Sequence, residues 1–298
     1  MMDGRTLEYF ARAYEEHNFA QAAKLIPISP QGLAKAIRSL EKELEAPLFD
    51  NSTGAQIPTE YGVRLYRYAL EHRQSIRELH ADFDTIRRSR SGVIRIGACI
   101  GVMGVVPFSV FDDFQAAYPN VRVEREDIPD YLCDERLRDG YYDMAFTLWP
   151  YADEFETIEL YRDSHFIWMA STDPLAQKDA VAIEDLEGKA LHSVGPEYKG
   201  HNELQRLLES KGVRLGKSTV SGEMDWLHHM AGTGEGLSLT VRHKAELFGD
   251  DRSITARPVP ELPWRFGLSY KKGRALSAHE RAFASFCIRL MDQGAMPR

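Results

Sequence analysis

The sequence has few of the features that mark disulfide-rich, membrane-spanning or secreted proteins. Its 298 residues include only three cysteines, Cys99, Cys133 and Cys287, whose odd number and wide spacing match neither a disulfide framework nor a zinc site. No segment approaches the roughly 18 consecutive apolar residues of a membrane-spanning helix. Charges interrupt the first ten residues, where a secretory peptide has an apolar core. We therefore expect a cytoplasmic protein with reduced thiols, no metal site and no membrane partner.

Motifs for covalent catalysis, phosphate binding and metalloprotease chemistry are also missing. The sequence has no Gly-x-Ser-x-Gly turn, phosphate loop or His-Glu-x-x-His helix. The glycine-rich segment 232–236 lacks the spacing of a dinucleotide site, and the adjacent His228 and His229 would point to different sides. We expect neither an enzyme nor a bound cofactor. A redox switch formed by Cys99 and Cys133 stays open as an alternative to ordinary core packing.

Charge is distributed unevenly along the chain. The formal net charge of −8 at pH 7 argues against non-specific nucleic-acid binding. Acidic and basic residues balance over the first ninety residues, so the remainder of the chain carries the whole negative charge. A neutral N-terminal segment followed by an acidic remainder gives only weak support to an N-terminal DNA contact. The main support for that interpretation comes from the helix pattern.

The first part of the chain has the pattern of a helix-turn-helix. Apolar residues within 7–14 repeat at helical spacing, and Asn18 is expected to cap a short second helix over 19–26. Ser29 followed by Pro30 marks the start of a third, longer helix, because a hydroxyl cap and a proline at the first helical position favour initiation. A short helix, a turn and a longer helix are typical of DNA-binding heads.

The third helix has two opposite faces. An apolar stripe that faces a core consists of Leu33, Ile37, Leu40 and Leu44. A polar face lies about 200° around the helix and consists of Gln31, Lys35, Arg38 and Lys42. These side-chain types contact base edges and phosphates in a major groove. A solvated face is the alternative for an isolated helix, but the preceding helix and turn favour DNA binding.

Two short extended segments follow the third helix. Residues 47–49 and 56–58 flank the polar turn 50–54, which predicts a small hairpin of the wing type. Thr59 and Glu60 then mark the start of a long helix. The predicted DNA-contact residues are Ser29, Pro30, Gln31, Lys35, Arg38, Lys42, Ser52, Gln56 and Thr59.

The order and spacing of these motifs resemble the N-terminal signature of the LysR-type transcriptional regulators. The matching segments are Phe19 to Ala23, Ser29 to Ile37, Leu40 to Leu44, Pro47 to Phe49 and Pro58 to Gly62. The resemblance implies a sequence-specific transcriptional regulator with a winged helix-turn-helix over residues 1–60 and double-stranded DNA as its partner. It also implies that the recognition helix runs from Ser29 to Leu44.

A long helix is predicted to join this head to the rest of the chain. Residues 61–91 contain no proline and, after Gly62, no glycine before the end of the helix, and their apolar residues form a seam of near-heptad period. A coiled-coil homodimer agrees with the resemblance, and a helix that covers the seam with its own protein is the alternative. The predicted dimerisation residues are Leu65, Tyr68, Ile76, Leu79 and Phe83, and residues 89–92 form the expected hinge.

From residue 92 onward, strands alternate with helices, which favours an α/β domain around a largely parallel sheet. This part resembles the LysR effector domain in the segments Gly92 to Gly97, Pro107 to Pro119, Leu137 to Asp143, Asp173 to Ala176 and Gly232 to Gly236. The resemblance implies two subdomains like those of periplasmic binding proteins and a homotetramer as an alternative to the dimer. The expected division of residues 92–298 is subdomain I at about 92–161 and 267–298, and subdomain II at about 162–266.

Ligands of such sheets bind beyond the carboxyl ends of the strands. The residues predicted to bind a small organic effector there are Cys99, Ile100, Gly101, Pro129, Asp130, Thr147, Gly195, Pro196 and Met224. Capping of its own helix is the simpler interpretation of Asp130. Because these positions include an acid and no cation, we expect an effector that is not strongly anionic, unless Lys199 or His201 turns towards it.

Two other classes of protein remain as alternatives. A solute-binding protein would account for residues 92–298 but not for the helix-turn-helix pattern. A two-domain enzyme would need convergent acid–base groups in the cleft, and the sequence shows none in a recognisable arrangement.

Overall fold

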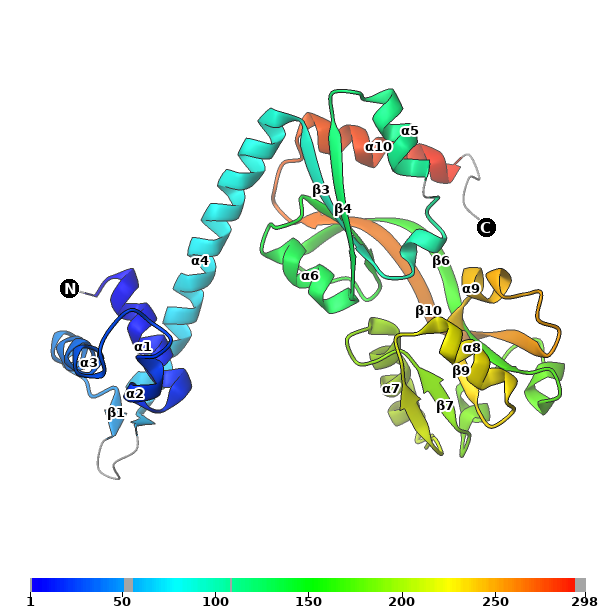
Figure 1. The fold of residues 1–298 in the computed structure, drawn as a ribbon, viewed down its shortest axis with the longest axis horizontal. Helices are drawn as coiled ribbons and strands as arrows, with labels where there is room; N and C mark the ends of the chain where they lie inside the picture. The colour runs from blue at the N-terminus through cyan, green and yellow to red at the C-terminus, as the bar shows by residue number, and fades with distance from the viewer. Residues whose placement is uncertain (1, 51–55, 108, 293–298) are drawn as a thin grey trace. The chain divides into compact units, whose positions relative to one another are not determined.

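A computed structural model of the protein describes residues 2–50, 56–107 and 109–292. The chain divides into two compact units, one up to Phe83, here called the head, and one from Asp84 onward. The long helix α4 (Glu60–Ser91) contributes to both (Figure 1). Among the described residues, no helix combines the length and apolar character that a membrane span needs.

The head is built from short helices and a small hairpin. Its elements before α4 are α1 (Gly4–Glu16), α2 (Phe19–Ala22), α3 (Pro30–Leu44), β1 (Phe49–Asp50) and β2 (Ile57–Pro58). The predicted start of α3 is confirmed, because the Ser29 hydroxyl accepts the Gly32 N–H at 3.1 Å. The strands β1 and β2 pair antiparallel, as a wing hairpin requires. The second helix is shorter than predicted, since the chain continues from Ala23 as turns.

The apolar stripe of α3 forms the centre of the head. Leu33, Ile37 and Leu40 are buried together with Phe10 of α1, whereas Leu44, at the end of the helix, is exposed. The first half of α4 packs on α1, and its Tyr66 ring stacks on Tyr14 with the ring centres 4.0 Å apart. The head therefore includes the start of the linker helix as part of its core.

The second unit contains one eight-stranded sheet in the order β4-β3-β5-β10-β6-β9-β7-β8. Its strands are β3 (Val93–Cys99), β4 (Arg122–Ile128), β5 (Met144–Leu148), β6 (Phe155–Ala170), β7 (Leu191–Ser193), β8 (Ser218–Val220), β9 (Leu237–Val241) and β10 (Ile254–Lys271). The predicted parallel pairing is confirmed at both ends of the sheet, where β4-β3-β5 and β9-β7-β8 are parallel, but not at its centre. The central strands β6 and β10 run antiparallel to each other and to their neighbours, because one carries the chain out of the first half of the sheet and the other brings it back.

Helices cover both halves of this sheet. Those of the second unit are α5 (Ser109–Ala117), α6 (Asp130–Arg138), α7 (Lys199–Lys211), α8 (Met224–Gly232), α9 (Arg242–Leu247) and α10 (Ala278–Asp292). Three short 3-10 helices are η1 (Val102–Gly104), η2 (Pro174–Gln177) and η3 (Ile183–Leu186). The helices α5 and α10 lie together at one half, and α7, α8 and α9 lie at the other (Figure 1).

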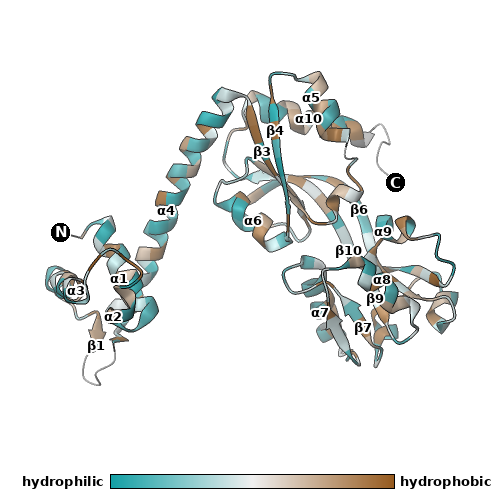
Figure 2. Cartoon of the chain, in the orientation of Figure 1, coloured by the Kyte–Doolittle hydropathy of each residue, from teal (hydrophilic) through white to brown (hydrophobic). Residues whose placement is uncertain are grey.

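The halves of the sheet have separate hydrophobic cores, which define two lobes. Lobe I is built around buried residues within 94–161 and 264–287, and lobe II around buried residues within 167–262. Figure 2 shows β3 mostly in the apolar colour, and β4 and much of α4 in the polar colour. The chain returns from lobe II to lobe I between Leu262 and Trp264, whereas the sequence places this boundary between residues 266 and 267.

The linker helix ends differently from the prediction. The expected hinge at 89–92 is helical through Ser91, and only Gly92, with φ +71°, leaves the helix. Arg88 fixes this end to lobe I, because its guanidinium binds the buried Asp143 carboxylate with an N–O distance of 2.6 Å. The same carboxylate accepts the backbone N–H of Arg95 on β3 at 2.8 Å. The last turn of α4 is therefore packed against lobe I.

Candidate functional site

The polar face of α3 is exposed, as its position opposite the buried stripe requires. The face consists of Gln31, Lys35, Arg38 and Lys42, all exposed to solvent. Within the described part of the chain, its three cations have no ion-pair partner, so their N–H groups are available to an anion. Ser29 and Pro30 lie at the start of the same helix, where the helix dipole favours an anion such as a phosphate.

The remaining predicted DNA-contact residues differ in their surroundings. The Thr59 hydroxyl donates to the Pro47 carbonyl at 2.6 Å and accepts the Gly62 N–H at 3.1 Å, so it serves the fold of the head. Gln56 is half-buried, and its side-chain oxygen has no hydrogen-bond partner in the described chain. Ser52 lies outside the described residues. A contact that the sequence did not suggest fixes the wing, since Glu41 accepts the backbone N–H groups of Leu48 and Phe49.

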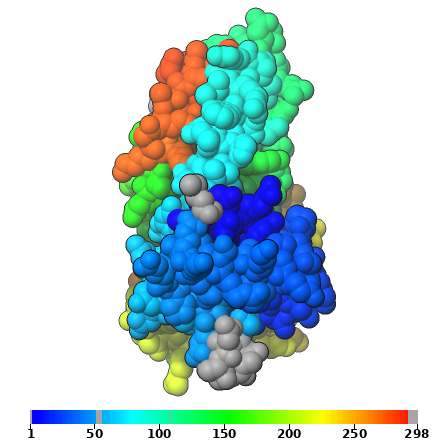
Figure 3. All heavy atoms as spheres, turned by 90° about the vertical axis from the view of Figure 1, so that its left-hand side faces the viewer, coloured from blue at the N-terminus to red at the C-terminus, as the bar shows by residue number. Residues whose placement is uncertain are grey.

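The predicted seam of α4 divides into a buried and an exposed part. Leu65 is only 9% exposed and belongs to the core of the head, so its assignment to the dimer interface is wrong. The other predicted residues, Tyr68, Ile76, Leu79 and Phe83, are each 45–47% exposed. In the space-filling view of Figure 3, the cyan part of the chain, which includes the later turns of α4, lies at the visible surface.

The carboxyl ends of β3, β4 and β5 meet at one edge of lobe I, because these strands are parallel. Asp130 follows β4 and is the first residue of α6, but it does not cap that helix as expected. Its Oδ2 atom instead accepts the backbone N–H of Lys199, the first residue of α7 in lobe II, at 2.8 Å. A carboxylate of one lobe thus caps a helix of the other, where the helix dipole favours negative charge.

The side chain of Lys199 crosses in the opposite direction, from lobe II into lobe I. Its Nζ atom lies 2.7 Å from Oδ2 of Asp134, 2.8 Å from the Leu148 carbonyl oxygen and 2.9 Å from the Pro150 carbonyl oxygen. These three acceptors use all three donors of an ammonium group. The side chain is only 2% exposed, so the contact between lobes is dry.

Burial shapes the acidity of this cluster. It raises the pKa of Asp130 to about 6, although the Lys199 backbone N–H and ammonium oppose the rise. It also raises the pKa of Asp134 above its ordinary value, again against the effect of the Lys199 ammonium. Both carboxylates are more than nine-tenths buried, and within the described chain the Oδ1 atom of each has no hydrogen-bond partner. The cluster therefore holds more acceptor capacity and negative charge than Lys199 satisfies.

Several residues predicted to line the cleft lie beneath its surface instead. Cys99 is fully buried, and burial together with the neighbouring Cys133 thiol raises its pKa well above the ordinary value. A thiol in that environment is a poor nucleophile, which weakens the redox hypothesis. Thr147 is also fully buried, and its hydroxyl is bonded to that of Ser269 on β10. Neither side chain is available to a ligand in this arrangement.

The other predicted effector residues are spread over both lobes. Ile100 is exposed, and Gly101, with φ +98°, has open space where a Cβ atom would stand. Gly195 is closed off by the Glu197 carboxylate. Met224 packs at the edge of the cluster around Trp168 in lobe II. Only Pro196, of the nine predicted residues, lines the groove between α6 and α7 described next.

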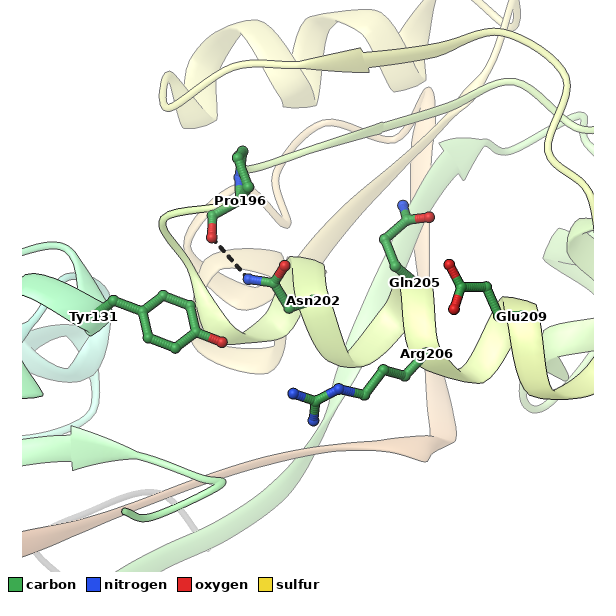
Figure 4. A pocket seen from close by; sticks show the side chains of 6 residues that line it. All are labelled: Tyr131, Pro196, Asn202, Gln205, Arg206 and Glu209. Carbon is green, nitrogen blue, oxygen red and sulfur yellow. Dashed lines mark hydrogen bonds between the residues drawn. The ribbon is translucent and has the colours of Figure 1, made fainter. Parts of the chain in front are cut away.

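A groove of about 480 Å³ lies between α6 of lobe I and α7 of lobe II. Its walls, shown in Figure 4, are formed by Tyr131, Pro196, Asn202, Gln205, Arg206 and Glu209. The Tyr131 ring points towards α7, and the Asn202 amide donates to the Pro196 carbonyl at 2.7 Å. The groove adjoins Asp130 and Lys199 along the chain, and its volume suits a small organic molecule.

Comparison with known proteins agrees with this division of the chain. A family model described as "LysR substrate binding domain" matches residues 87–292, and one described as "Bacterial regulatory helix-turn-helix protein, lysR family" matches residues 5–63. The chain belongs to the LysR family. As a LysR-type protein, it is a DNA-binding transcriptional regulator with a C-terminal effector-binding domain.

Individual LysR relatives match along most of the chain. The regulator YybE of Bacillus subtilis is 23% identical over 96% of this chain and 98% of its own length. The regulator BenM of Acinetobacter baylyi is 26% identical over 80% of each chain. The crystal structure of full-length BenM covers all of both chains with a TM-score of 0.59 and 20% identity, which supports the LysR fold.

Sequence reasoning missed the residues that join the two lobes of this LysR domain. From the sequence, Lys199 is expected only as a cation that turns towards the effector, and no role is expected for Asp134 or Tyr131. Asp134 lies four residues after Asp130 and thus on the same side of α6, which is the one signal that could have paired them. No group of three or more His, Cys, Asp or Glu residues in the described chain is arranged to hold a metal ion.

Proposed function

We propose that this LysR-type regulator contacts its DNA site through the exposed face of α3, and that the four side chains Gln31, Lys35, Arg38 and Lys42 carry the contact. The observation that supports this is the arrangement of that face, three cations and an amide opposite a buried stripe. Guanidinium and amide groups bond base edges, and ammonium groups bond phosphates. The protein acts in the cytoplasm as a regulator and not as an enzyme.

The regulator acts as a homodimer or homotetramer. The support comes from α4, where Tyr68, Ile76, Leu79 and Phe83 expose an apolar seam that water does not favour. Two such seams form a coiled coil, and the resulting two-fold symmetry suits a DNA site with two half-sites.

A small effector binds between lobe I and lobe II and changes how the two heads engage DNA. The support is the groove between α6 and α7, which adjoins the contacts that link Asp130 and Asp134 to Lys199. An effector shifts the protein only if its affinity differs between the closed and open arrangements of the lobes. Binding at this boundary gives such a difference.

A fluorescence-anisotropy titration tests the DNA contact. The full chain is titrated against labelled DNA flanking its own coding region, with non-specific competitor and at two salt concentrations. We expect Arg38→Ala to weaken binding about 10-fold, since one good base contact is worth about 1–3 kcal/mol. Arg162→Ala removes one exposed cation from the second unit and serves as the control. Equal affinities for the two variants would remove Arg38 from the interface.

A further inference from the structure

The contact between Asp134 and Lys199 defines a site as well as a bond. Lobe I supplies three acceptors, Asp134 Oδ2 and the carbonyl oxygens of Leu148 and Pro150, at 2.7–2.9 Å from one nitrogen. We call this set the ammonium cage. Its members come from α6 and from the end of β5 and the residues after it, so lobe I forms the cage without any part of lobe II.

The charge of the surroundings favours a cation. Asp130 and Asp134 are 1% and 5% exposed, and each has an Oδ1 atom without a hydrogen-bond partner in the described chain. Arg138 and Glu154 act on Asp134 with opposite signs and pair with each other, so they add little net charge. If Lys199 leaves, two buried carboxylates lose their cation, and buried charge without a partner is strongly unfavourable.

We infer that the effector of this regulator carries a protonated primary amine, and that this group takes the place of the Lys199 ammonium in the cage when lobe II moves away. This inference rests on the proposed function, because it names the chemical class of the effector. The remainder of the molecule lies in the groove lined by Tyr131, Arg206 and Glu209. The lysine acts as a tethered competitor that holds the lobes closed while the effector is absent.

The decisive experiment restores the missing ammonium chemically. The full-length Lys199→Ala variant is heated with rising concentrations of n-propylammonium chloride, and the thermal midpoint of unfolding is recorded. Three additives serve as controls. Potassium chloride supplies a cation without an amine, n-propanol has the same size without a charge, and sodium propionate has a similar size with the opposite charge. At ten times its Kd, a bound ligand raises the midpoint of a domain of this size by roughly 3–6 °C. We expect that rise with propylammonium alone.

Two further variants show where the amine binds. Lys199→Ala/Asp134→Asn removes the carboxylate of the cage and should lose the response. Lys211→Ala removes a lysine from the other end of α7, where the ammonium pairs with Glu184 at the surface. Because this variant keeps Lys199 as a competitor, propylammonium should raise its midpoint by much less than that of Lys199→Ala. A similar rise with all four additives, or an equal rise with propylammonium in Lys211→Ala and Lys199→Ala, would overturn the inference. So would stabilisation of the unchanged chain by propionate that Lys199→Ala abolishes, because the lysine would then bind an anion.

A measurement on the unchanged chain covers the case in which Lys199→Ala does not fold. Propylammonium competes with Lys199, so hydrogen exchange at residues 196–204 should accelerate with propylammonium and not with potassium chloride or tetramethylammonium. Unchanged exchange in all three salts would refute the inference. DNA binding by the same preparation separates this result from the proposed function, since a chain that binds DNA without an amine response refutes only the effector class.

Discussion

Replacing Arg88 with methionine tests whether the linker helix is fixed to lobe I. The Arg88 and Asp143 side chains are 10% and 2% exposed, so the substitution leaves a buried carboxylate without its cation. Loss of one partner of a buried ion pair costs about 3–5 kcal/mol of folding stability. The backbone N–H of Arg95 still donates to Asp143 in the variant, so we expect a loss near the lower end, about 3 kcal/mol. Methionine preserves the apolar stem, so the effect isolates the charged group.

Arg87 provides a matched control one residue away. It pairs with Asp84 at the surface, where the side chains are 72% and 53% exposed, and such pairs contribute less than about 1 kcal/mol. A loss of 3 kcal/mol lowers the thermal midpoint of a unit of this size by roughly 6–12 °C. We therefore expect a shift of that size in Arg88→Met and a much smaller one in Arg87→Met, measured by calorimetry.

Limited trypsin digestion provides a second readout of the same change. Release of the last turn should speed cleavage after Arg87 and Arg90 in Arg88→Met, because local opening exposes the backbone to the protease. Equal midpoints and equal cleavage rates in Arg88→Met and the unchanged chain would refute the argument that Arg88 fixes the end of α4.

Three other outcomes follow from exposed and buried groups. Leu79→Asp should convert the oligomer to monomer in analytical ultracentrifugation, while Arg77→Asp, on another face of α4, should leave it assembled; matching sedimentation would contradict the seam. Because folding raises the pKa of Asp130 to about 6 from 3.8, its stabilising protonation is present below about pH 4 and lost as the pH rises through 6. The unchanged chain should lose stability relative to Asp130→Asn between pH 4.5 and 7, and parallel melting curves would disprove this. The thiols of Cys99 and Cys133 should react with Ellman's reagent only after unfolding, and rapid labelling of the native chain would revive the redox hypothesis.

Local signals predicted the head well, because each acts over a few residues. The cap at Ser29 and the periodic stripe from Leu33 to Leu40 fixed the position of α3, and its exposed face followed directly from that stripe. Leu65 belongs to the same heptad pattern as the exposed seam, but it is buried because it packs into the core of the head. Periodicity shows that a residue faces an apolar surface, but not whether that surface belongs to the same chain or to a second copy.

The candidate effector site was harder to predict for two physical reasons. Thr147 lies near the carboxyl end of β5, where a ligand contact is expected. Because β5 is buried on both faces, the Thr147 hydroxyl bonds to Ser269 inside the lobe instead. The pairing of Lys199 with Asp134 joins residues of two lobes, and no local pattern relates them.

The path of the chain through the two lobes also sets the order in which they can form during synthesis. Lobe II is one continuous segment, so its core is complete once the ribosome has released Leu262. Lobe I is interrupted, and its core needs Phe266 and Phe283 from the end of the chain. Domains generally fold as they emerge from the ribosome. The nascent chain therefore passes through a stage in which the head and lobe II are folded, while lobe I, including Asp134, is incomplete because the end of β10 and α10 have not yet been synthesised.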